Sequence, residues 1–242
     1  MDRESNVTLN RSLSARRLIT GLDGVVAVFL ILFLLPVLAL IVLAICLEDG
    51  SPIFYRQPRV AQHGRQFVLY KFRKFRVDAS SNGSAVTLRN DERFTRVGRI
   101  LERTKLDELP QLWNVVNGDM SIVGPRPESL AFADCFHGQY RELLQYRPGI
   151  LGPAQTLFRN ESAFYPEGQD PEDFYREVLF PAKAGIDLAY YPVRSLRSDC
   201  AWATRCCLAV LGMTGPWQRA GVANTIRIVT EFGRSLPNHR VG

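Results

Sequence analysis

The chain has 242 residues, of which 46% are hydrophobic and 22% are charged. This length suits one good-sized domain or two small ones, and the composition excludes a chain that is disordered throughout. The net charge of +6 indicates an anionic partner, for which phosphate groups, acidic lipid and nucleic acid are candidates. Five cysteines without a C-x-x-C pair favour a reducing compartment, and three widely separated histidines lack the spacing of a zinc site.

The N-terminal part divides into a polar tail and an apolar segment. Residues 1–18 show no periodicity, and we expect a flexible tail or a short interfacial helix. Within the membrane segment predicted at residues 19–48, the 23 residues from Val25 to Leu47 include no charged or strongly polar side chain. About 20 apolar residues cover a bilayer core, whereas the apolar region of a signal peptide has only about 7–15. The sequence therefore predicts a membrane anchor.

Pro36 stands in the middle of this apolar run. Proline removes a backbone hydrogen bond and clashes with the preceding turn, so it favours a break in the helix. Basic residues follow and precede the run, and by the positive-inside rule both flanks are then cytoplasmic. A re-entrant helix hairpin satisfies both observations, and we predict it. A straight or kinked membrane-spanning helix is the alternative, because membrane helices tolerate proline.

The following segments predict a small domain at residues 49–215. Pro52–Pro58 and Gln66–Arg73 are rich in aromatic and β-branched residues and flank His63-Gly64, which is typical of a β-hairpin. Apolar side chains at helical spacing predict one helix around Phe94–Leu101 and a second around Leu109–Val116.

A later amphipathic segment, Asp199–Leu211, is predicted either to lie flat on a membrane surface or to form a buried core helix. Residues 216–242 are predicted as a C-terminal extension. The expected fold class is α+β and mostly helical: a small catalytic domain with an N-terminal re-entrant membrane helix hairpin and interfacial amphipathic helices.

The stretch from Thr104 to Glu128 carries the chemistry. Asp107 followed by Pro110 is typical of a helix start, because proline in the first turn loses only an amide that lacks a partner there. We therefore expect the carboxylate of Asp107 to face the positive end of a helix, to stay ionised, and to meet phosphate oxygens at that end. An aspartate at this position more often only caps the helix, so the pair Asp107-Glu108 alone does not establish catalysis.

Basic residues accompany the acidic pair. Arg126 lies between Pro125 and Pro127, which restrict the backbone that presents it. Arginine and lysine side chains bind phosphate oxygens, and arginine does so with a fork of donors. The pattern indicates a diphosphate site, and its basic candidates are Lys71, Arg73, Arg103, Lys105 and Arg126.

Several motifs then occur in one order along the chain. They are Pro52-Ile-Phe-Tyr-Arg-Gln57, Tyr70-Lys-Phe-Arg73, Leu106-Asp-Glu-Leu-Pro-Gln-Leu-Trp-Asn-Val115, Gly118-Asp-Met-Ser-Ile-Val-Gly-Pro-Arg-Pro-Glu128 and Arg147-Pro-Gly-Ile150. Through them the chain, from about Asp23 to Leu211, resembles the bacterial sugar transferase family, the monotopic polyprenyl-phosphate phosphoglycosyl transferases.

The resemblance implies a reaction and a set of site residues. Asp107 would attack the sugar-linked phosphate of a UDP-sugar, releasing UMP and leaving a phosphosugar on the aspartate, which undecaprenyl phosphate then attacks. Two such steps predict ping-pong kinetics. The resemblance also implies Mg²⁺, with Asp107 and Glu108 as candidate ligands, and a role for Glu108 in metal binding or in activating the acceptor. The predicted phosphate-binding residues are Lys71, Arg73, Arg103, Arg126, Glu128 and Arg147.

The resemblance places the protein at the bacterial inner (cytoplasmic) membrane, with the catalytic domain on the cytoplasmic face and membrane lipid as a further partner. No additional block of membrane helices is expected in this compact form. Lys74-Phe75, Leu151 and Pro153 depart from the family pattern, so the sugar is left open. The segment from Phe158 to Tyr191 is expected to contribute a lid or a sugar pocket.

Two other classes of function remain as alternatives. A membrane-tethered module that binds anionic lipid headgroups would use the same basic residues without catalysis. A nucleic-acid-binding protein would also carry positive charge, but no helix-turn-helix, zinc or RNA-recognition signature accompanies it here. We therefore expect no nucleic-acid partner.

Overall fold

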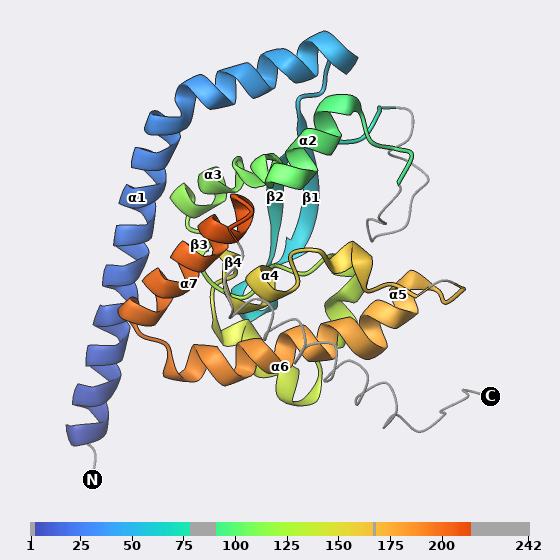
Figure 1. The fold of residues 1–242 in the computed structure, drawn as a ribbon. Coiled ribbons are helices and arrows are strands. Elements are labelled where there is room, and N and C mark those ends of the chain that lie inside the picture. Colours follow the sequence, from blue (N-terminus) through green and yellow to red (C-terminus); the bar gives the residue numbers. More distant parts are fainter. Residues whose placement is uncertain (1–2, 78–90, 167, 214–242) are drawn as a thin grey trace.

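The computed structural model describes residues 3–77, 91–166 and 168–213, with the backbone alone for residues 3–20. The predicted C-terminal extension, residues 216–242, lies outside the described residues. The described part is mostly helical and contains two small sheets of two strands each, as the α+β prediction requires (Figure 1).

The α-helices are α1 (Arg3–Asp49), α2 (Arg96–Thr104), α3 (Gln111–Val116), α4 (Pro153–Leu157), α5 (Pro171–Phe174), α6 (Phe180–Tyr190) and α7 (Leu196–Val210). The strands are β1 (Phe54–Val60), β2 (Gln66–Phe72), β3 (Ser121–Val123) and β4 (Gly149–Leu151). Short 3-10 helices are η1 (Gln62–Gly64), η2 (Leu106–Glu108), η3 (Leu130–Cys135), η4 (Gly138–Gln145), η5 (Glu161–Ala163) and η7 (Tyr191–Val193), and η6 (Tyr175–Leu179) is a π-helical turn.

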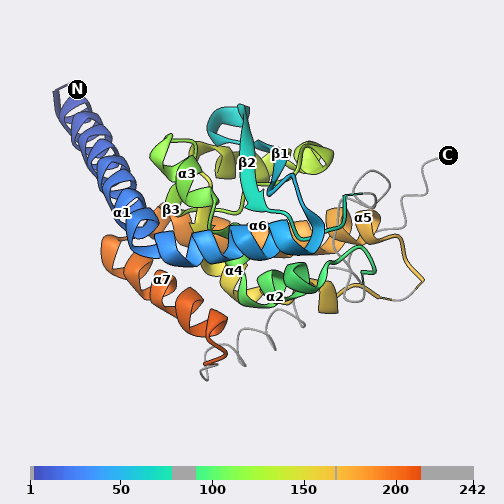
Figure 2. The same cartoon turned by 90° about the horizontal axis from the view of Figure 1, so that it is seen from above.

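Helix α1 is long, apolar and bent. Residues 3–18, predicted as a flexible tail or a short helix, form its first turns. Its two arms meet at an open angle (Figures 1 and 2), and Pro36, in its interior, is the expected cause of the bend. Among the described residues, Gly21–Asp49 is the one stretch long and apolar enough to cross a membrane, and only 11% of its most apolar window is buried in the protein. The arms do not return antiparallel, so the re-entrant hairpin stays a prediction.

The buried side of α1 holds the upper part of the domain together. In the first arm, Ala27 is fully buried in a cluster with Phe67, Leu69 and Leu112 from β2 and α3. In the second arm, Ile41 and Ile45 pack with Phe72 and Leu101.

The end of α1 is also bound by Arg73, the residue that directly follows β2. The guanidinium of Arg73 donates to Oδ2 of Asp49 at 2.5 Å and to the carbonyls of Asp49 and Gly50 at 3.0 and 2.8 Å. Arg73 is 6% exposed, so these bonds satisfy a guanidinium that water barely reaches.

The predicted β-hairpin is confirmed. Strands β1 and β2 pair antiparallel, with Phe54 opposite Phe72, and the turn between them places His63 and Gly64 at positive φ. The fully buried side chain of Asn114 fastens α3 to this hairpin, because its Oδ1 accepts from the amide of Tyr70 and its Nδ2 donates to a neighbouring carbonyl. The two helices predicted before and after the acidic pair are confirmed as α2 and α3.

The lower part of the domain is built on α6. Buried aromatic and aliphatic side chains around Leu179 and Phe180 form a third cluster. Above it, the parallel strands β3 and β4 pack against α7. Helix α4 follows β4 in the chain and also packs against α7. Helix α7 is amphipathic, with Cys206 and Ala209 buried and Leu196 exposed, so it is not an entirely buried core helix. Contact of its exposed face with a membrane stays a prediction.

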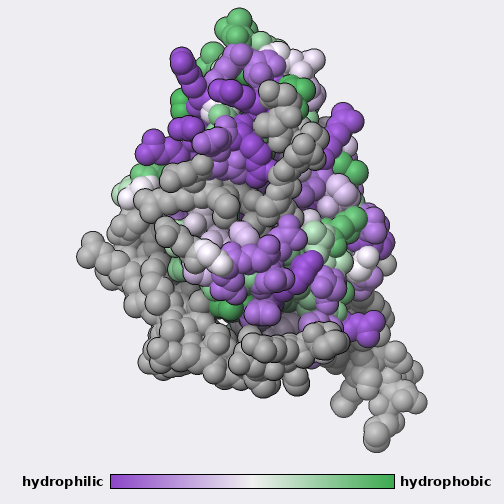
Figure 3. Space-filling view, turned by 90° about the vertical axis from the view of Figure 1, so that its right-hand side faces the viewer, coloured by the Kyte–Doolittle hydropathy of each residue, from purple (hydrophilic) through white to green (hydrophobic). Residues whose placement is uncertain are grey.

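The domain surface is polar where it faces away from α1. Figure 3 shows hydrophilic residues over most of the coloured area of this side and apolar residues gathered at the top, where α1 ends. The apolar residues at the top of this view belong to the edge of the domain where α1 ends.

Gly98 allows α2 to approach the chain after β2, and its replacement by alanine is expected to destabilise the protein. A Cβ at this position would lie 2.0 Å from the backbone oxygen of Lys74, which the structure relieves only by moving the backbone. We expect the Gly98→Ala variant to lose about 1–3 kcal/mol of stability. The measurement is thermal unfolding in detergent.

Gly185→Ala is the matched control, because it also changes a glycine inside a helix but meets no atom within 4 Å. Alanine in place of glycine there should stabilise the protein by about 0.5–1 kcal/mol. Equal midpoints for the two variants would contradict the close approach of α2.

Candidate active site

The acidic pair lies in η2, between α2 and α3. Lys105 ends α2 in the left-handed conformation, with φ of 58°, and the chain then makes one 3-10 turn through Asp107 and Glu108. Helix α3 has Pro110 at its N-cap position and no side-chain cap. The prediction that Asp107 caps a helix is therefore wrong. Asp107 belongs to the 3-10 turn η2, and the N-cap position of α3 falls three residues later, at Pro110.

Asp107 is 1% exposed, and its Oδ1 has no hydrogen-bond partner. Burial raises the pKa of Asp107, the cation of Lys71 lowers it in part, and the adjacent Glu108 carboxylate raises it again, so that the pKa stays above its ordinary value. The cation of Lys71 favours the charged form of Asp107, and the predicted ionisation of this carboxylate stays a prediction.

Glu108 has the opposite environment. Its Oε1 lies 2.8 Å from Nζ of Lys71 and 3.3 Å from an Nη atom of Arg126, and the carboxylate side chain is 13% exposed. Burial by itself would raise the pKa of Glu108, but Lys71, Arg126 and Lys105 outweigh it and hold that pKa well below its usual range. Glu108 is therefore ionised at neutral pH and forms the centre of a buried ion cluster with Lys71 and Arg126.

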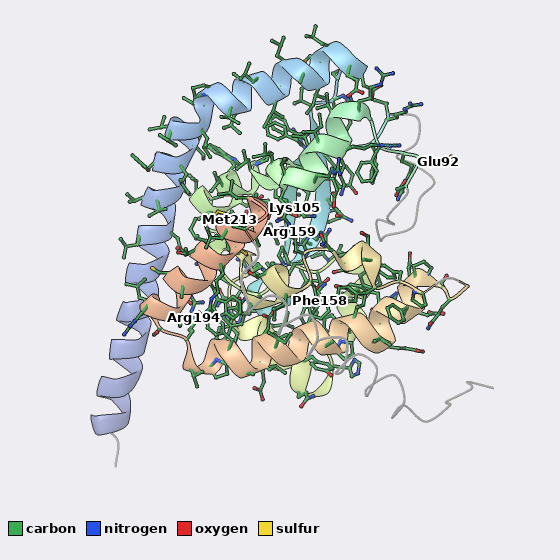
Figure 4. All side chains as sticks on the ribbon, in the orientation of Figure 1. Glu92, Lys105, Phe158, Arg159, Arg194 and Met213 are labelled. Atoms are coloured by element: carbon green, nitrogen blue, oxygen red, sulfur yellow. The ribbon has the colours of Figure 1, made fainter. Side chains whose placement is uncertain are left out.

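A cleft of about 1350 Å³ opens beside this ion cluster. Glu108 lines it, whereas Asp107 lies behind the wall. Lys105 and Arg159, both labelled in Figure 4, line the cleft, and Arg159 donates to the carbonyl of Arg103 at 2.8 Å. The basic side chains on the cleft wall are Arg56, Arg59, Lys71, Arg73, Lys74, Arg93, Lys105, Arg126, Arg159 and Lys183.

The loop that carries Arg126 is fixed on three sides. Its carbonyls accept hydrogen bonds from Arg59 at Pro127 (3.1 Å), from the amide of Val60 at Glu128 (3.0 Å) and from the amide of Gly149 at Pro125 (2.8 Å). Glu108 raises the pKa of Arg126 while burial opposes it, so this guanidinium stays charged. The sequence analysis did not identify Arg59, because nothing in β1 indicates that its side chain turns toward a loop 68 residues away.

A second buried polar group lies at another part of the cleft wall. Lys183 of α6 lies 3.0 Å from Glu161 and 3.6 Å from Glu128, and Tyr175 donates to Glu128 at 2.5 Å. Sequence reasoning missed Lys183 and Tyr175, since neither belongs to a local motif. Glu161 falls in the segment expected to form a lid or sugar pocket, and that segment does contribute to the cleft.

The structure brings together four of the predicted site residues on the cleft wall: Lys71, Glu108, Arg126 and Glu128. Arg73 also borders the cleft, but its guanidinium is engaged with the end of α1.

Two predicted site residues lie elsewhere, because their elements point them away from the cleft. Arg103 is exposed on the last turn of α2, and Arg147 precedes β4 with a buried Nη1 that has no partner. Neither side chain lines the cleft, so the phosphate-binding roles of Arg103 and Arg147 stay predictions.

The donor set is compatible with Mg²⁺ only when a ligand supplies oxygens. Within residues 3–77, 91–166 and 168–213, no group of three or more His, Cys, Asp or Glu side chains is placed to hold a metal ion. Mg²⁺ is usually bound through one or two carboxylates together with substrate phosphates and water. Asp107, with a free Oδ1, and Glu108 fit that mode, and they do not form a metal cage of their own.

Comparison with known proteins identifies the family. The model of the bacterial sugar transferase family matches residues 14–213, which is most of the chain. The chain therefore belongs to the bacterial sugar transferase family.

Among its relatives are two UDP-glucose:undecaprenyl-phosphate glucose-1-phosphate transferases. That of Caulobacter vibrioides is 43% identical over 138 residues, covering 56% of this chain and 52% of the relative. That of Escherichia coli is 41% identical over 140 residues, covering 55% and 29%.

A third relative is the UDP-N-acetylgalactosamine-undecaprenyl-phosphate N-acetylgalactosaminephosphotransferase of Aeromonas hydrophila. It is 38% identical over 142 residues, covering 57% of this chain and 33% of the relative. The matches thus span about a third to a half of the length of these relatives.

Replacing Lys71 by methionine removes the closest counter-charge of Glu108 and should destabilise the protein by about 3 kcal/mol at pH 7, the cost of breaking a buried ion pair. The depressed pKa of Glu108 means that its ionised form contributes stability above its unfolded pKa, and that this contribution is lost as pH falls through the folded pKa. Without Lys71, the pKa of Glu108 in the folded protein rises. The difference between variant and parent should therefore be largest at pH 7 and shrink below about pH 4.5.

The measurement is urea or thermal unfolding in detergent at pH 7 and pH 4. Arg65→Met, at an exposed position of the β-hairpin, is the control for loss of one positive charge. A Lys71→Met difference that is the same at both pH values would contradict the ion pair.

Proposed function

We propose that this protein transfers a sugar 1-phosphate from a UDP-sugar to undecaprenyl phosphate, a first step in assembling an exopolysaccharide, an O-antigen or another glycan. The observation that carries the proposal is the buried ion cluster of Lys71, Glu108 and Arg126 beside Asp107, in a cleft of the same domain that packs on α1. The names of the relatives support it, since each combines a sugar phosphate with undecaprenyl phosphate.

The basic side chains provide the binding energy for the donor. Lys71 and Arg126 both contact Glu108 and line the cleft, where their charges can meet a diphosphate. Lys105 and Arg159 add positive charge on the same wall. Positioned cations of this kind also stabilise the negative charge that develops when a phosphoryl group is transferred.

The first step is attack by Asp107. A carboxylate oxygen forms a bond to the phosphorus that carries the sugar, the bond between this phosphorus and the bridging oxygen of the diphosphate breaks, and UMP leaves with the electron pair. In the second step an oxygen of undecaprenyl phosphate attacks the same phosphorus and releases the Asp107 carboxylate. The products are UMP and an undecaprenyl diphosphate sugar.

The burial of Asp107 sets a requirement on this mechanism. Because the side chain is 1% exposed and lies behind the cleft wall, η2 must shift when the donor binds so that the carboxylate meets the phosphorus. The negative diphosphate then competes with Glu108 for Lys71 and Arg126, which frees the Glu108 carboxylate. We assign to Glu108 the binding of Mg²⁺ or the activation of the acceptor phosphate.

Mg²⁺ is part of the proposal. Asp107 and Glu108 would hold it together with oxygens of the donor, and it would neutralise phosphate charge and improve UMP as a leaving group. The residues of the chain hold the donor and present the nucleophile.

We further propose that α1 enters and leaves the membrane on the cytoplasmic side. Its exposed apolar side chains call for lipid, and the bend at its interior proline allows the two ends to remain on one side. An acceptor with a lipid tail and a phosphate headgroup would then lie at the level of the domain that packs on α1.

Asp107→Asn is expected to reduce UMP release from a UDP-sugar by at least about a thousandfold, because the amide is not a nucleophile. UMP is measured with full-length protein, undecaprenyl phosphate and a panel of UDP-sugars, with Mg²⁺ or with EDTA, and EDTA should abolish the release. Asp119→Asn, beyond α3 and off the cleft wall, is the matched control with near-parental activity. Without acceptor, mass spectrometry should find one phosphosugar on the Asp107 peptide.

An adduct on Glu108 would exchange the roles assigned to the two acids. Unchanged UMP release by the Asp107→Asn variant, or no release from any donor by the parent, would reject the mechanism and favour the module that binds anionic lipid.

The proposed topology predicts that the N-terminus and the domain lie on the same side of the membrane. In a cysteine-free variant, Ser12→Cys and Arg141→Cys should both resist an impermeant maleimide in right-side-out spheroplasts and both react in inverted vesicles. Labelling of Ser12→Cys from outside would show instead that α1 crosses the membrane.

A further inference from the structure

The cleft wall carries a second buried polar group, away from the acidic pair, that the transfer steps do not use. It consists of Glu161, Lys183, Tyr175 and Glu128, and it is referred to below as the Glu161 group. Arg126 lies between the two sites: it contacts Glu108 directly, and Glu161 and Glu128 are close enough for their charges to raise the pKa of Arg126. Arg126 and all four members of the Glu161 group line the same cleft, so a donor bound through Arg126 shares that cleft with the Glu161 group.

Within the Glu161 group, one member can still accept further hydrogen bonds. Lys183 donates to Glu161 at 3.0 Å and to the hydroxyl of Tyr175 at 2.7 Å, and its third proton faces Glu128. Tyr175 in turn donates to Glu128 at 2.5 Å. The donors of Lys183 and Tyr175 are thus used within the protein.

Glu161 is different. One of its oxygens accepts from Lys183 and the other from Tyr165 at 3.1 Å, so each oxygen has a single protein donor. Each carboxylate oxygen has about two acceptor sites. The side chain of Glu161 is 29% exposed, against 5% for Lys183 and 8% for Glu128. Glu161 therefore combines unused acceptor capacity with a place on the cleft wall.

The charge of Glu161 determines what kind of ligand it accepts. Burial alone would raise the pKa of Glu161, but Lys183, Arg126 and the bond from Tyr165 lower it, so the carboxylate is ionised at neutral pH. An ionised carboxylate accepts hydrogen bonds and repels phosphate oxygens. It therefore suits the hydroxyl or amide N–H groups of a sugar.

We propose that Glu161 reads the donor sugar: its carboxylate accepts hydrogen bonds from ring hydroxyl or acetamido groups of the hexose, and Lys183 is the residue that positions it. This inference rests on the proposed function and deepens it by naming the residue that selects the sugar. The relatives are named for glucose and for N-acetylgalactosamine, which differ in the group at C2 and in the orientation of the hydroxyl at C4. A carboxylate that accepts a hydrogen bond from one of these groups favours the sugar that presents it, because the other sugar loses a charge-assisted hydrogen bond.

The test is binding of UDP, UDP-glucose, UDP-galactose, UDP-N-acetylglucosamine and UDP-N-acetylgalactosamine to full-length protein in detergent. Asp107→Asn is the background, so that no transfer consumes the donor. The ratio of the affinity for the best of the four sugar donors to the mean affinity for the other three is compared in the background alone and with Glu161→Gln. Glu142→Gln, exposed on η4 and off the cleft wall, is the matched control.

We expect Glu161→Gln to reduce this ratio by about tenfold, the effect of one charge-assisted hydrogen bond, while the affinity for UDP changes less than twofold. Lys183→Met should reduce the ratio in the same direction, whereas a purely structural role would weaken all four donors alike. Thermal unfolding of each variant verifies that it is folded.

Preservation of the ratio in folded Glu161→Gln overturns the inference, and so does absence of binding by every UDP-sugar. A ratio that depends on Glu161, in a protein whose UMP release does not depend on Asp107, supports the inference and rejects the transfer mechanism. The two ideas therefore fail separately.

Discussion

The carboxylate of Glu108 is removed from water and held by two cations, and this arrangement constrains the rest of the domain. Transferring an ion out of water costs several kcal/mol, which only close and well-placed counter-charges offset. Here those charges are Lys71 on β2 and Arg126 on the loop after β3, so three separate segments must meet at one point. The hairpin, α3 and the first arm of α1 share one apolar cluster that brings β2 toward the acidic pair.

The same interaction explains why the two adjacent acids differ. Glu108 takes both cations and has a lowered pKa, whereas Asp107 is left with an unpartnered oxygen and a raised pKa. A carboxylate without fixed hydrogen bonds is poorly stabilised and hence reactive toward phosphorus once it is ionised. In the proposed mechanism, Lys71 and Arg126 hold Glu108 in place, and Oδ1 of Asp107 is left without a hydrogen-bond partner.

Features that depend on neighbouring residues could be predicted from the sequence. The hairpin follows from two β-rich segments around a turn, α2 and α3 follow from apolar spacing, and the bend in α1 accompanies Pro36. The environment of Asp107 could not be predicted, because a 3-10 turn in place of a helix start depends on packing with distant segments.

Long-range partners were missed for the same reason. An arginine such as Arg73 is a residue type that often binds phosphate. In this structure, however, Arg73 binds the end of α1, which lies 24 residues earlier. Lys183 belongs to no motif, and only the fold places it beside Glu161, 22 residues away. Charge type is visible in a sequence, but the partner of a charge is decided by tertiary structure.

The bonds of Arg73 to the end of α1 have one further consequence. Lys71 and Arg73 are two positions apart along one extended segment, about 7 Å, and on the same side of it. Arg73 binds the end of α1, and Lys71 binds Glu108 of the acidic pair. The spacing between the end of α1 and the Lys71 side of the ion cluster is thus set by the end of β2 and the residue that follows it.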